Sequence, residues 1–177
     1  MIDSENYDYI ILADVIEHIT EPDVFLEHLI KHTNEKTKFI ISIPNVAFGG
    51  LRLALLNGFF DYVDSGLLER THLRFFTLNS AMYLFKKLGF YFELIASLER
   101  SFYRMEFSRD VIRANPLTIL NLAIDSNARA YQYLFVLSKN PSSTVIKKYG
   151  VNALNILFDA IFVRSIFRKI LHYWRKF

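Results

Sequence analysis

A short apolar run near the start of the chain gives way at once to acidic and imidazole side chains. The run Tyr9–Leu12 combines aromatic and β-branched residues with leucine, which favours a strand buried on both faces. In an open α/β sheet, ligands bind where the strands end. The sequence therefore predicts a ligand-binding edge formed by the polar residues that follow this strand: Asp14, Glu17 and His18.

Helix-like and strand-like patterns alternate after this run. Residues 20–23 have the form of a capping box with proline in the first turn, which predicts a helix over residues 21–32. A second buried strand is expected at residues 38–43, because Pro44 cannot donate to a ladder. Residues 45–66 hold four of the six glycines, and we interpret them as a functional loop with a short helix at residues 51–56.

The second half of the body continues the alternation. Thr77 is a predicted N-cap, and Gly89 is expected to end the same helix in the left-handed conformation. Strands are expected at residues 90–97 and 131–138, with a helix around residues 117–124 between them. The expected organisation is an α/β domain over residues 1–143.

Composition and charge exclude some classes of function. The 177 residues are 52% hydrophobic, enough for one domain with an appendage, and contain no cysteine, which fits a cytoplasmic protein and excludes thiolate chemistry. The net charge of +3 is uneven, because residues 144–177 hold seven basic residues and one acidic residue. A slightly acidic body lacks the positive face of a nucleic-acid-binding domain, so no nucleic-acid partner is expected.

Four motifs occur in an order that resembles the second half of class I S-adenosylmethionine-dependent methyltransferases. They are DYIILADVIEH at residues 8–18, IPN at 43–45, FDY at 60–62 and THLRFFT at 71–77. The resemblance covers residues 6–140 and implies a partial Rossmann-like sheet, strands four to seven, whose last pair is antiparallel. The four motifs together are similar to those of a subset of this family that is associated with cell-surface polysaccharide and lipid-linked glycan metabolism. The implied activity is methyl transfer to a sugar hydroxyl or a similar small acceptor.

The resemblance also implies where the cofactor would bind. Leu12, Ala13 and Asp14 match the positions that line the methionine end of S-adenosylmethionine. Complete members of the family have a glycine-rich turn for the cofactor, whereas this chain has no glycine before Gly49. Three explanations stay open: the chain is a fragment of a longer enzyme, which we favour, a partner chain supplies the N-terminal half, or cofactor binding has been lost. In the last case the chain would be a non-catalytic interaction or membrane-associated module.

Glu17, His18 and His72 are the predicted catalytic residues. By the resemblance, Glu17 and His18 lie just beyond the cofactor, and His72 enters from the loop on the substrate side. Either imidazole can take a proton from an acceptor near neutral pH. The alternative is structural: Glu17 and His18 hold the start of a helix, and His72 packs between the loop and the sheet.

A divalent metal ion is a further possibility at the same residues. Asp14, Glu17, His18 and His72 are similar in pattern to the E-x-x-E-H…H set with which small-RNA 2′-O-methyltransferases hold a divalent ion. Oxygen and imidazole ligands suit magnesium or manganese. The alternative is that these charged residues are solvated or paired.

Other residues of the loop have two interpretations each. Arg70 and Arg74 would bind a phosphate of the acceptor or pair with Asp61 or Asp64. The aromatic residues of the loop would stack on a sugar ring or, as we favour, form a core beneath a lid: Phe59, Phe60, Tyr62, Phe75 and Phe76.

The basic tail, residues 144–177, is predicted to contain an amphipathic helix. From residue 156 onward its apolar residues recur at helical spacing among arginines and lysines: Ile166, Phe167, Ile170, Leu171 and Trp174. Such a helix would bind the inner membrane face or dock on the domain or on a partner.

Overall fold

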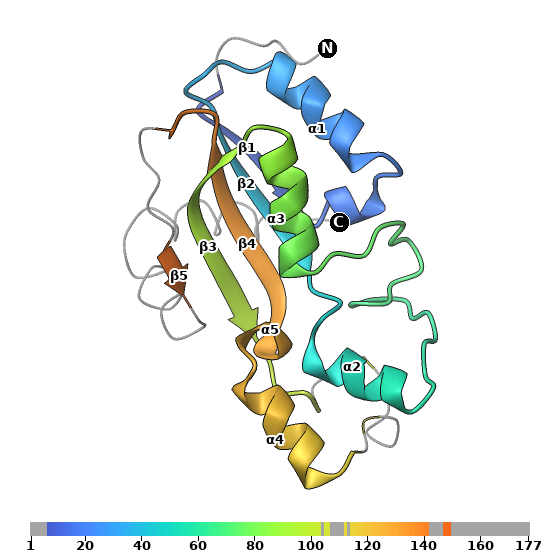
Figure 1. The fold of residues 1–177 in the computed structure, drawn as a ribbon. Helices are drawn as coiled ribbons and strands as arrows, with labels where there is room; N and C mark the ends of the chain where they lie inside the picture. The colour runs from blue at the N-terminus through green and yellow to red at the C-terminus, as the bar shows by residue number, and fades with distance from the viewer. Residues whose placement is uncertain (1–6, 104, 107–111, 113, 142–146, 150–177) are drawn as a thin grey trace, which may run out of the picture.

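The computed structural model describes residues 7–103, 105–106, 112, 114–141 and 147–149. These residues form a five-stranded sheet with the order β1-β2-β4-β3-β5, accompanied by short helices (Figure 1). The strands are β1 (Tyr9–Ala13), β2 (Lys38–Pro44), β3 (Tyr91–Glu99), β4 (Ala130–Ser138) and β5 (Lys147–Tyr149). The helices are η1 (Ile16–His18), α1 (Pro22–Lys31), α2 (Gly49–Leu56), α3 (Leu78–Lys87), α4 (Pro116–Ile124) and α5 (Ser126–Arg129).

The sheet mixes parallel and antiparallel pairs. β1 and β2 are parallel and are joined through α1, while β4 lies antiparallel between β2 and β3. The predicted α/β fold, with an antiparallel pair formed by the last two expected strands, is therefore confirmed. Because β1 and β2 are parallel, the segments after both strands meet at one edge of the sheet.

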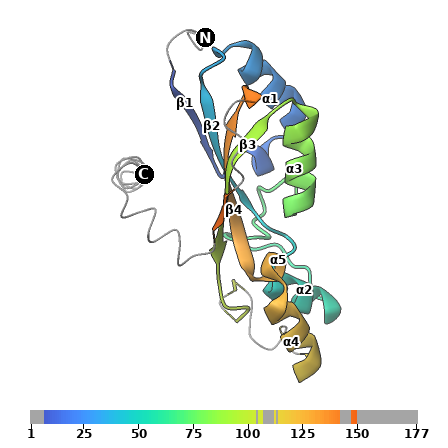
Figure 2. The ribbon, with the colours of Figure 1, turned by 60° about the vertical axis from the view of Figure 1, so that its left-hand side comes forward.

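The main hydrophobic core lies between the sheet and the helices α1 and α3. Both helices cover the same face of the sheet in the edge-on view (Figure 2). Phe39 of β2, Phe85 of α3 and Phe135 of β4 are fully buried there, and the rings of Phe85 and Phe135 are 5.1 Å apart between centroids. Burying a side chain of this size contributes roughly 1.5–3 kcal/mol.

The two predicted helix starts have different outcomes. The Thr77 side chain accepts a hydrogen bond from the Ser80 backbone N–H at 3.2 Å, so the predicted N-cap of α3 is confirmed. The predicted capping box before α1 is wrong. The N-cap residue is Glu21, and its side chain makes no capping hydrogen bond. The Asp23 carboxylate instead accepts from the N–H of Val24 and lies 3.5 Å from the Lys87 ammonium.

β1 is less buried than its apolar sequence predicts. Ile11 is 39% exposed, and only Leu12 is buried. Within the described sheet β1 pairs with β2 on one side and lies at the edge. The expectation of burial on both faces is therefore wrong for the described residues: Leu12 points toward α1 and α3, whereas Ile11 points to the opposite face, which no described helix covers (Figure 2).

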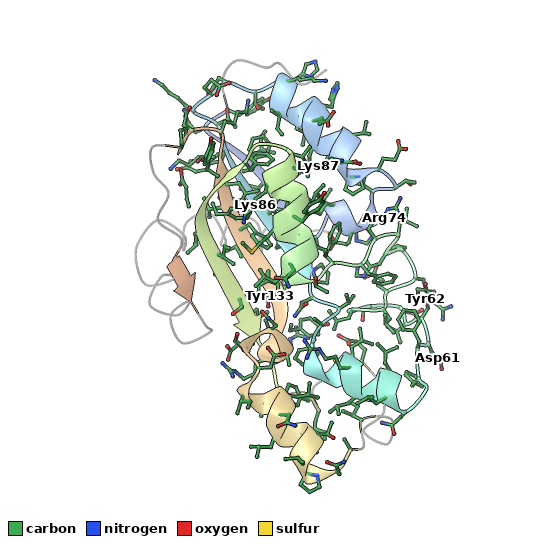
Figure 3. The ribbon with its side chains drawn as sticks, in the orientation of Figure 1. Asp61, Tyr62, Arg74, Lys86, Lys87 and Tyr133 are labelled. Carbon is green, nitrogen blue, oxygen red and sulfur yellow. The ribbon has the colours of Figure 1, made fainter. Side chains whose placement is uncertain are left out.

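The segment between β2 and α3 forms a second core with residues from β4. Phe48, Leu51 and Leu68 are fully buried there, and the ring centroids of Phe48 and Tyr131 are 5.3 Å apart. The loop aromatics divide. Phe76 is buried, and Phe59 packs against this second core. The expectation that the loop aromatic residues form a core beneath a lid is wrong for three others, each of which is at least 36% exposed: Phe60, Tyr62 and Phe75. Tyr62 lies at the outer edge of the loop (Figure 3).

Within the described ranges, no helix has the length and apolarity needed to cross a membrane. Of the predicted basic tail, only β5 is described, and it pairs in parallel with β3. The predicted amphipathic helix of residues 156–177 lies outside the described residues.

Candidate active site

Asp14 stands at the edge where β1 and β2 end. Its φ of 53° is left-handed, a conformation that aspartate tolerates because its short side chain bonds locally. The Asp14 N–H donates to the Ser42 hydroxyl oxygen at 3.0 Å, and that hydroxyl donates to Asp14 Oδ1 at 2.9 Å. Gln132 of β4 donates to the same oxygen. Hydrogen bonds from β2 and β4 therefore fix this carboxylate just beyond the end of β1.

Backbone hydrogen bonds join η1 to the THLRFFT segment. The N–H groups of Leu73 and Arg74 donate to the Glu17 carbonyl at 2.8 and 2.9 Å. His72 is thereby placed beside His18, with ring centroids 4.8 Å apart at an interplanar angle of 65°. Two segments separated by some fifty residues of sequence form one site.

The two histidines have the same tautomer. The Nδ1 atoms of His18 and His72 each lie 3.1 Å from a backbone carbonyl, of Thr71 and Leu67 respectively. A carbonyl oxygen only accepts, so both Nδ1 atoms carry a hydrogen. In a neutral imidazole, Nε2 then keeps its lone pair and can bind a proton or a metal.

Glu17 is a buried carboxyl beside these imidazoles. It is 1% exposed, and neither of its carboxylate oxygens has a hydrogen-bond partner of good geometry among the described residues. Burial raises the pKa of Glu17 to about 8. Its own backbone N–H lowers the pKa somewhat, and the carboxylates of Asp14 and Glu69 raise it further. Glu17 can therefore hold or release a proton near neutral pH.

Glu17, His18 and His72 form a compact set of donor atoms. One atom from each residue lies within 4.8 Å of the others. Asp14, the fourth residue of the predicted metal group, is not part of this compact set, and its carboxylate accepts hydrogen bonds from Ser42 and Gln132. A carboxylate with two imidazoles can bind a divalent metal or relay a proton.

A pocket of about 200 Å³ opens where β1 and β2 end. It contains three carboxyl groups and one arginine, and its lining is Asp14, Glu17, His18, Pro44, Gly66, Glu69, His72, Arg100, Tyr131 and Gln132. Arg100, Tyr131 and Gln132 are absent from the predicted site. Gln132 leaves a signal in the sequence, because it is a polar residue inside an apolar strand.

The two loop arginines are engaged elsewhere. Arg70 pairs with Asp64 at 3.0 Å, as one of the two interpretations expects. Arg74 lies where the loop passes the turn before α1, and its Nε donates to the Thr20 carbonyl at 2.8 Å (Figure 3). Neither arginine lines the pocket.

The sequence comparison decides the family. The family model for a methyltransferase domain matches residues 3–94, just over half of the chain. The chain belongs to the methyltransferase domain family. The matched part carries Asp14, Glu17, His18 and His72, whereas Arg100, Tyr131 and Gln132 lie beyond it.

Solved structures of methyltransferases show a distant similarity to this methyltransferase domain. A SAM-dependent methyltransferase from Thermotoga maritima has 13% identity and a TM-score of 0.48, covering 78% of this chain and 58% of its own. One from Archaeoglobus fulgidus has 13% identity and a TM-score of 0.47, covering 77% and 61%. The chain thus spans less than two thirds of their length. Among curated proteins, none matches the sequence.

The three residues predicted to bind the cofactor occupy different surroundings. Asp14 lines the pocket, whereas the Leu12 side chain packs in the main core. Ala13 is half-buried and pairs with Ser42 in the sheet register. Their contact with a cofactor stays a prediction, which for Leu12 concerns the backbone.

Proposed function

We propose that this domain is part of an S-adenosylmethionine-dependent methyltransferase that acts on a sugar hydroxyl or a similar small acceptor. The observation that supports it best is the burial of Glu17 beside His18 and His72, in a pocket where two parallel strands end. An ionisable group with a raised pKa in such a pocket is typical of catalytic sites.

The residues present fit the charge of the methyl donor. S-adenosylmethionine, when bound, supplies an electrophilic methyl group on a sulfonium cation. Asp14 and Glu69 line the pocket and would attract that positive charge, and Glu17, whose pKa is about 8, would add to the attraction once it ionises. The pocket volume of about 200 Å³ is below the roughly 300–1,000 Å³ of common ligand sites. The described residues would therefore supply one side of the cofactor site, with Leu12, Ala13 and Asp14 at its methionine end.

The histidines would act on the acceptor. As the acceptor oxygen bonds to the methyl carbon and the carbon–sulfur bond breaks, the hydroxyl proton must leave. The Nε2 atom of His18 or His72 can take it, because both Nδ1 atoms already donate to carbonyl groups. An ionised Glu17 would stabilise the imidazolium that results.

His18→Gln and His72→Gln test this role. The variant that removes the base should lower methyl transfer to the acceptor by roughly 10²–10⁴-fold while leaving donor affinity unchanged, because general-base catalysis is lost. His28→Gln, an exposed histidine on α1, is the matched control. Transfer at the wild-type rate in both site variants would contradict the proposal.

We also propose that Glu17, His18 and His72 bind a divalent metal ion such as manganese or magnesium. The donor set and the unpartnered carboxylate oxygens of Glu17 support this proposal. Electron paramagnetic resonance of Mn²⁺ added to the chain should show a bound signal that Glu17→Gln removes. An unchanged spectrum of free Mn²⁺ in the presence of the wild-type chain would contradict the metal site.

Further strands, from a longer chain or from a partner, are proposed to complete the sheet. Two observations support this: β1 is the outermost strand of the described sheet, and no helix of the described part covers the face of the sheet opposite α1 and α3 (Figure 2). S-adenosylmethionine titrations on this chain and on the gene extended upstream separate the enzyme from a non-catalytic module. Binding recovered on extension supports the enzyme, and failure of both supports the module.

For the basic tail we propose binding at the surface of the inner membrane, where it would bring the enzyme to a lipid-linked acceptor. Sedimentation with anionic and with neutral liposomes tests this. Protein that stays in the supernatant with anionic liposomes would contradict the membrane role.

A further inference from the structure

One part of the pocket is formed by residues that the proposed proton transfer does not use. Arg100 follows β3, Tyr131 belongs to β4, and both line the pocket. The Arg100 guanidinium carbon lies 3.8 Å from the centroid of the Tyr131 ring. The Tyr131 hydroxyl donates to Glu106 Oε1, and an Arg100 guanidinium nitrogen lies 3.9 Å from the same oxygen. The Tyr131 ring and the Glu106 carboxylate together hold the guanidinium at the pocket.

The Arg100 guanidinium has free hydrogen-bond donors. Its distance of 3.9 Å to the Glu106 carboxylate exceeds the length of a hydrogen bond, and its side chain is 41% exposed. Among the described residues, the contacts of the Arg100 guanidinium are the ion pair with Glu106 and the Tyr131 side chain, which leave part of its five N–H groups unused. The contact with the Tyr131 ring is made by the guanidinium carbon at 3.8 Å and does not use up the N–H groups, so those that Glu106 and Tyr131 leave unused are available to a ligand.

Arg100 differs in charge from the other ionisable groups that line the pocket. Arg100 is the only cationic side chain among the described lining residues. The Asp14 carboxylate is engaged by Ser42 and Gln132, and Glu69 accepts a hydrogen bond from the Thr71 hydroxyl at 2.6 Å. An anion would be repelled by these carboxylates and attracted to Arg100.

We propose that Arg100 binds a carboxylate or phosphate group of the acceptor. This inference rests on the proposed methyl transfer and specifies its substrate class: a hydroxylated compound with an oxyanion, such as a uronic acid or a sugar phosphate. The edge of a guanidinium offers parallel N–H donors that match both anions. With its anion on Arg100, the acceptor can direct a hydroxyl toward Glu17, His18 and His72, which line the same pocket.

Calorimetric titration of the full chain with glucuronate, glucose 6-phosphate and glucose tests the proposal. The wild type should bind both anionic sugars at least about tenfold more tightly than glucose, since hydrogen bonds to charged groups are the strong ones. Arg100→Gln should remove this preference, and Arg100→Lys, which keeps the charge but loses the paired donors, should reduce it. Arg70→Gln removes an exposed arginine outside the pocket and should leave the preference intact.

Several results would overturn the proposal. They are a wild type without the preference, an Arg100→Gln variant that retains it with an unchanged melting temperature, and an equal loss in Arg70→Gln. A parallel titration with S-adenosylmethionine distinguishes the source of the anion. If Arg100→Gln weakens only donor binding, the anion belongs to the donor and the proposal fails. Because the readout is sugar binding, its failure leaves the histidine test of methyl transfer unaffected.

Discussion

Replacing Glu17 with glutamine should remove a pH dependence that the buried carboxyl imposes on the stability of the domain. Burial is the main cause that raises the pKa of Glu17 from 4.5 to about 8. In the unfolded chain the same carboxyl ionises near its ordinary pKa. As the pH rises, the unfolded chain loses this proton first. The free energy of unfolding should therefore fall between about pH 4.5 and pH 8 and become level above that range.

The size of this fall follows from the two pKa values. At about 1.4 kcal/mol for each tenfold change in proton affinity, their difference corresponds to at most roughly 5 kcal/mol. A neutral glutamine resembles the protonated carboxyl. Glu17→Gln should therefore match the wild type near pH 5 and exceed its free energy of unfolding by about 3–5 kcal/mol above pH 8. Urea denaturation followed by circular dichroism, with a chelator present, measures both values.

The control variant is Glu27→Gln, which removes an exposed carboxylate from α1 and should leave the wild-type pH slope in place. The chelator matters because a bound cation would favour the ionised form of Glu17. If wild type and Glu17→Gln lose stability in parallel between about pH 5 and pH 8, burial does not control the ionisation of this carboxyl, and the reasoning is refuted.

Three further substitutions test the framework of the site by thermal or urea denaturation. Gly66→Ala should destabilise the domain by about 1–3 kcal/mol, because φ is +105° and the new methyl group would overlap the Glu106 carboxyl; wild-type stability would contradict this. Thr77→Ala should cost about 1 kcal/mol through the lost cap of α3, and rescue by Thr77→Ser would confirm the cause. Asn45→Ala should cost roughly 2–4 kcal/mol, because the carbonyls of Asn127 and Ala130 lose their shared donor; a loss below about 1 kcal/mol would contradict this.

Local pattern was enough to predict most elements of the fold. The strands β1, β2 and β4, the helices α1 and α3 and the short helix α4 lie at or near their expected positions, because apolar periodicity and terminal residues such as Thr77 act over a few neighbouring positions. The exposure of Ile11 was not predictable in this way. Burial of a strand depends on which strands and helices lie beside it, and β1 is at the edge of the described sheet.

The candidate site was predictable only where its residues lie in the recognised motifs. Glu17, His18 and His72 were found from their motifs, and the structure brings them together. Arg100 and Gln132 could not be assigned, because nothing local shows that the end of β3 and the start of β4 face the residues after β1. The pairing of Gln132 with Pro44 is a long-range contact.

The junction between η1 and the loop is made of main chain, with two amide groups on the Glu17 carbonyl. Alanine at position 73 would therefore leave it whole, because alanine keeps the backbone N–H that donates to Glu17. A proline at position 73 would remove one of the two donors and let the imidazoles drift apart without altering either of them. Part of the geometry of the candidate site is thus set by backbone N–H groups, which every residue except proline supplies at these two positions.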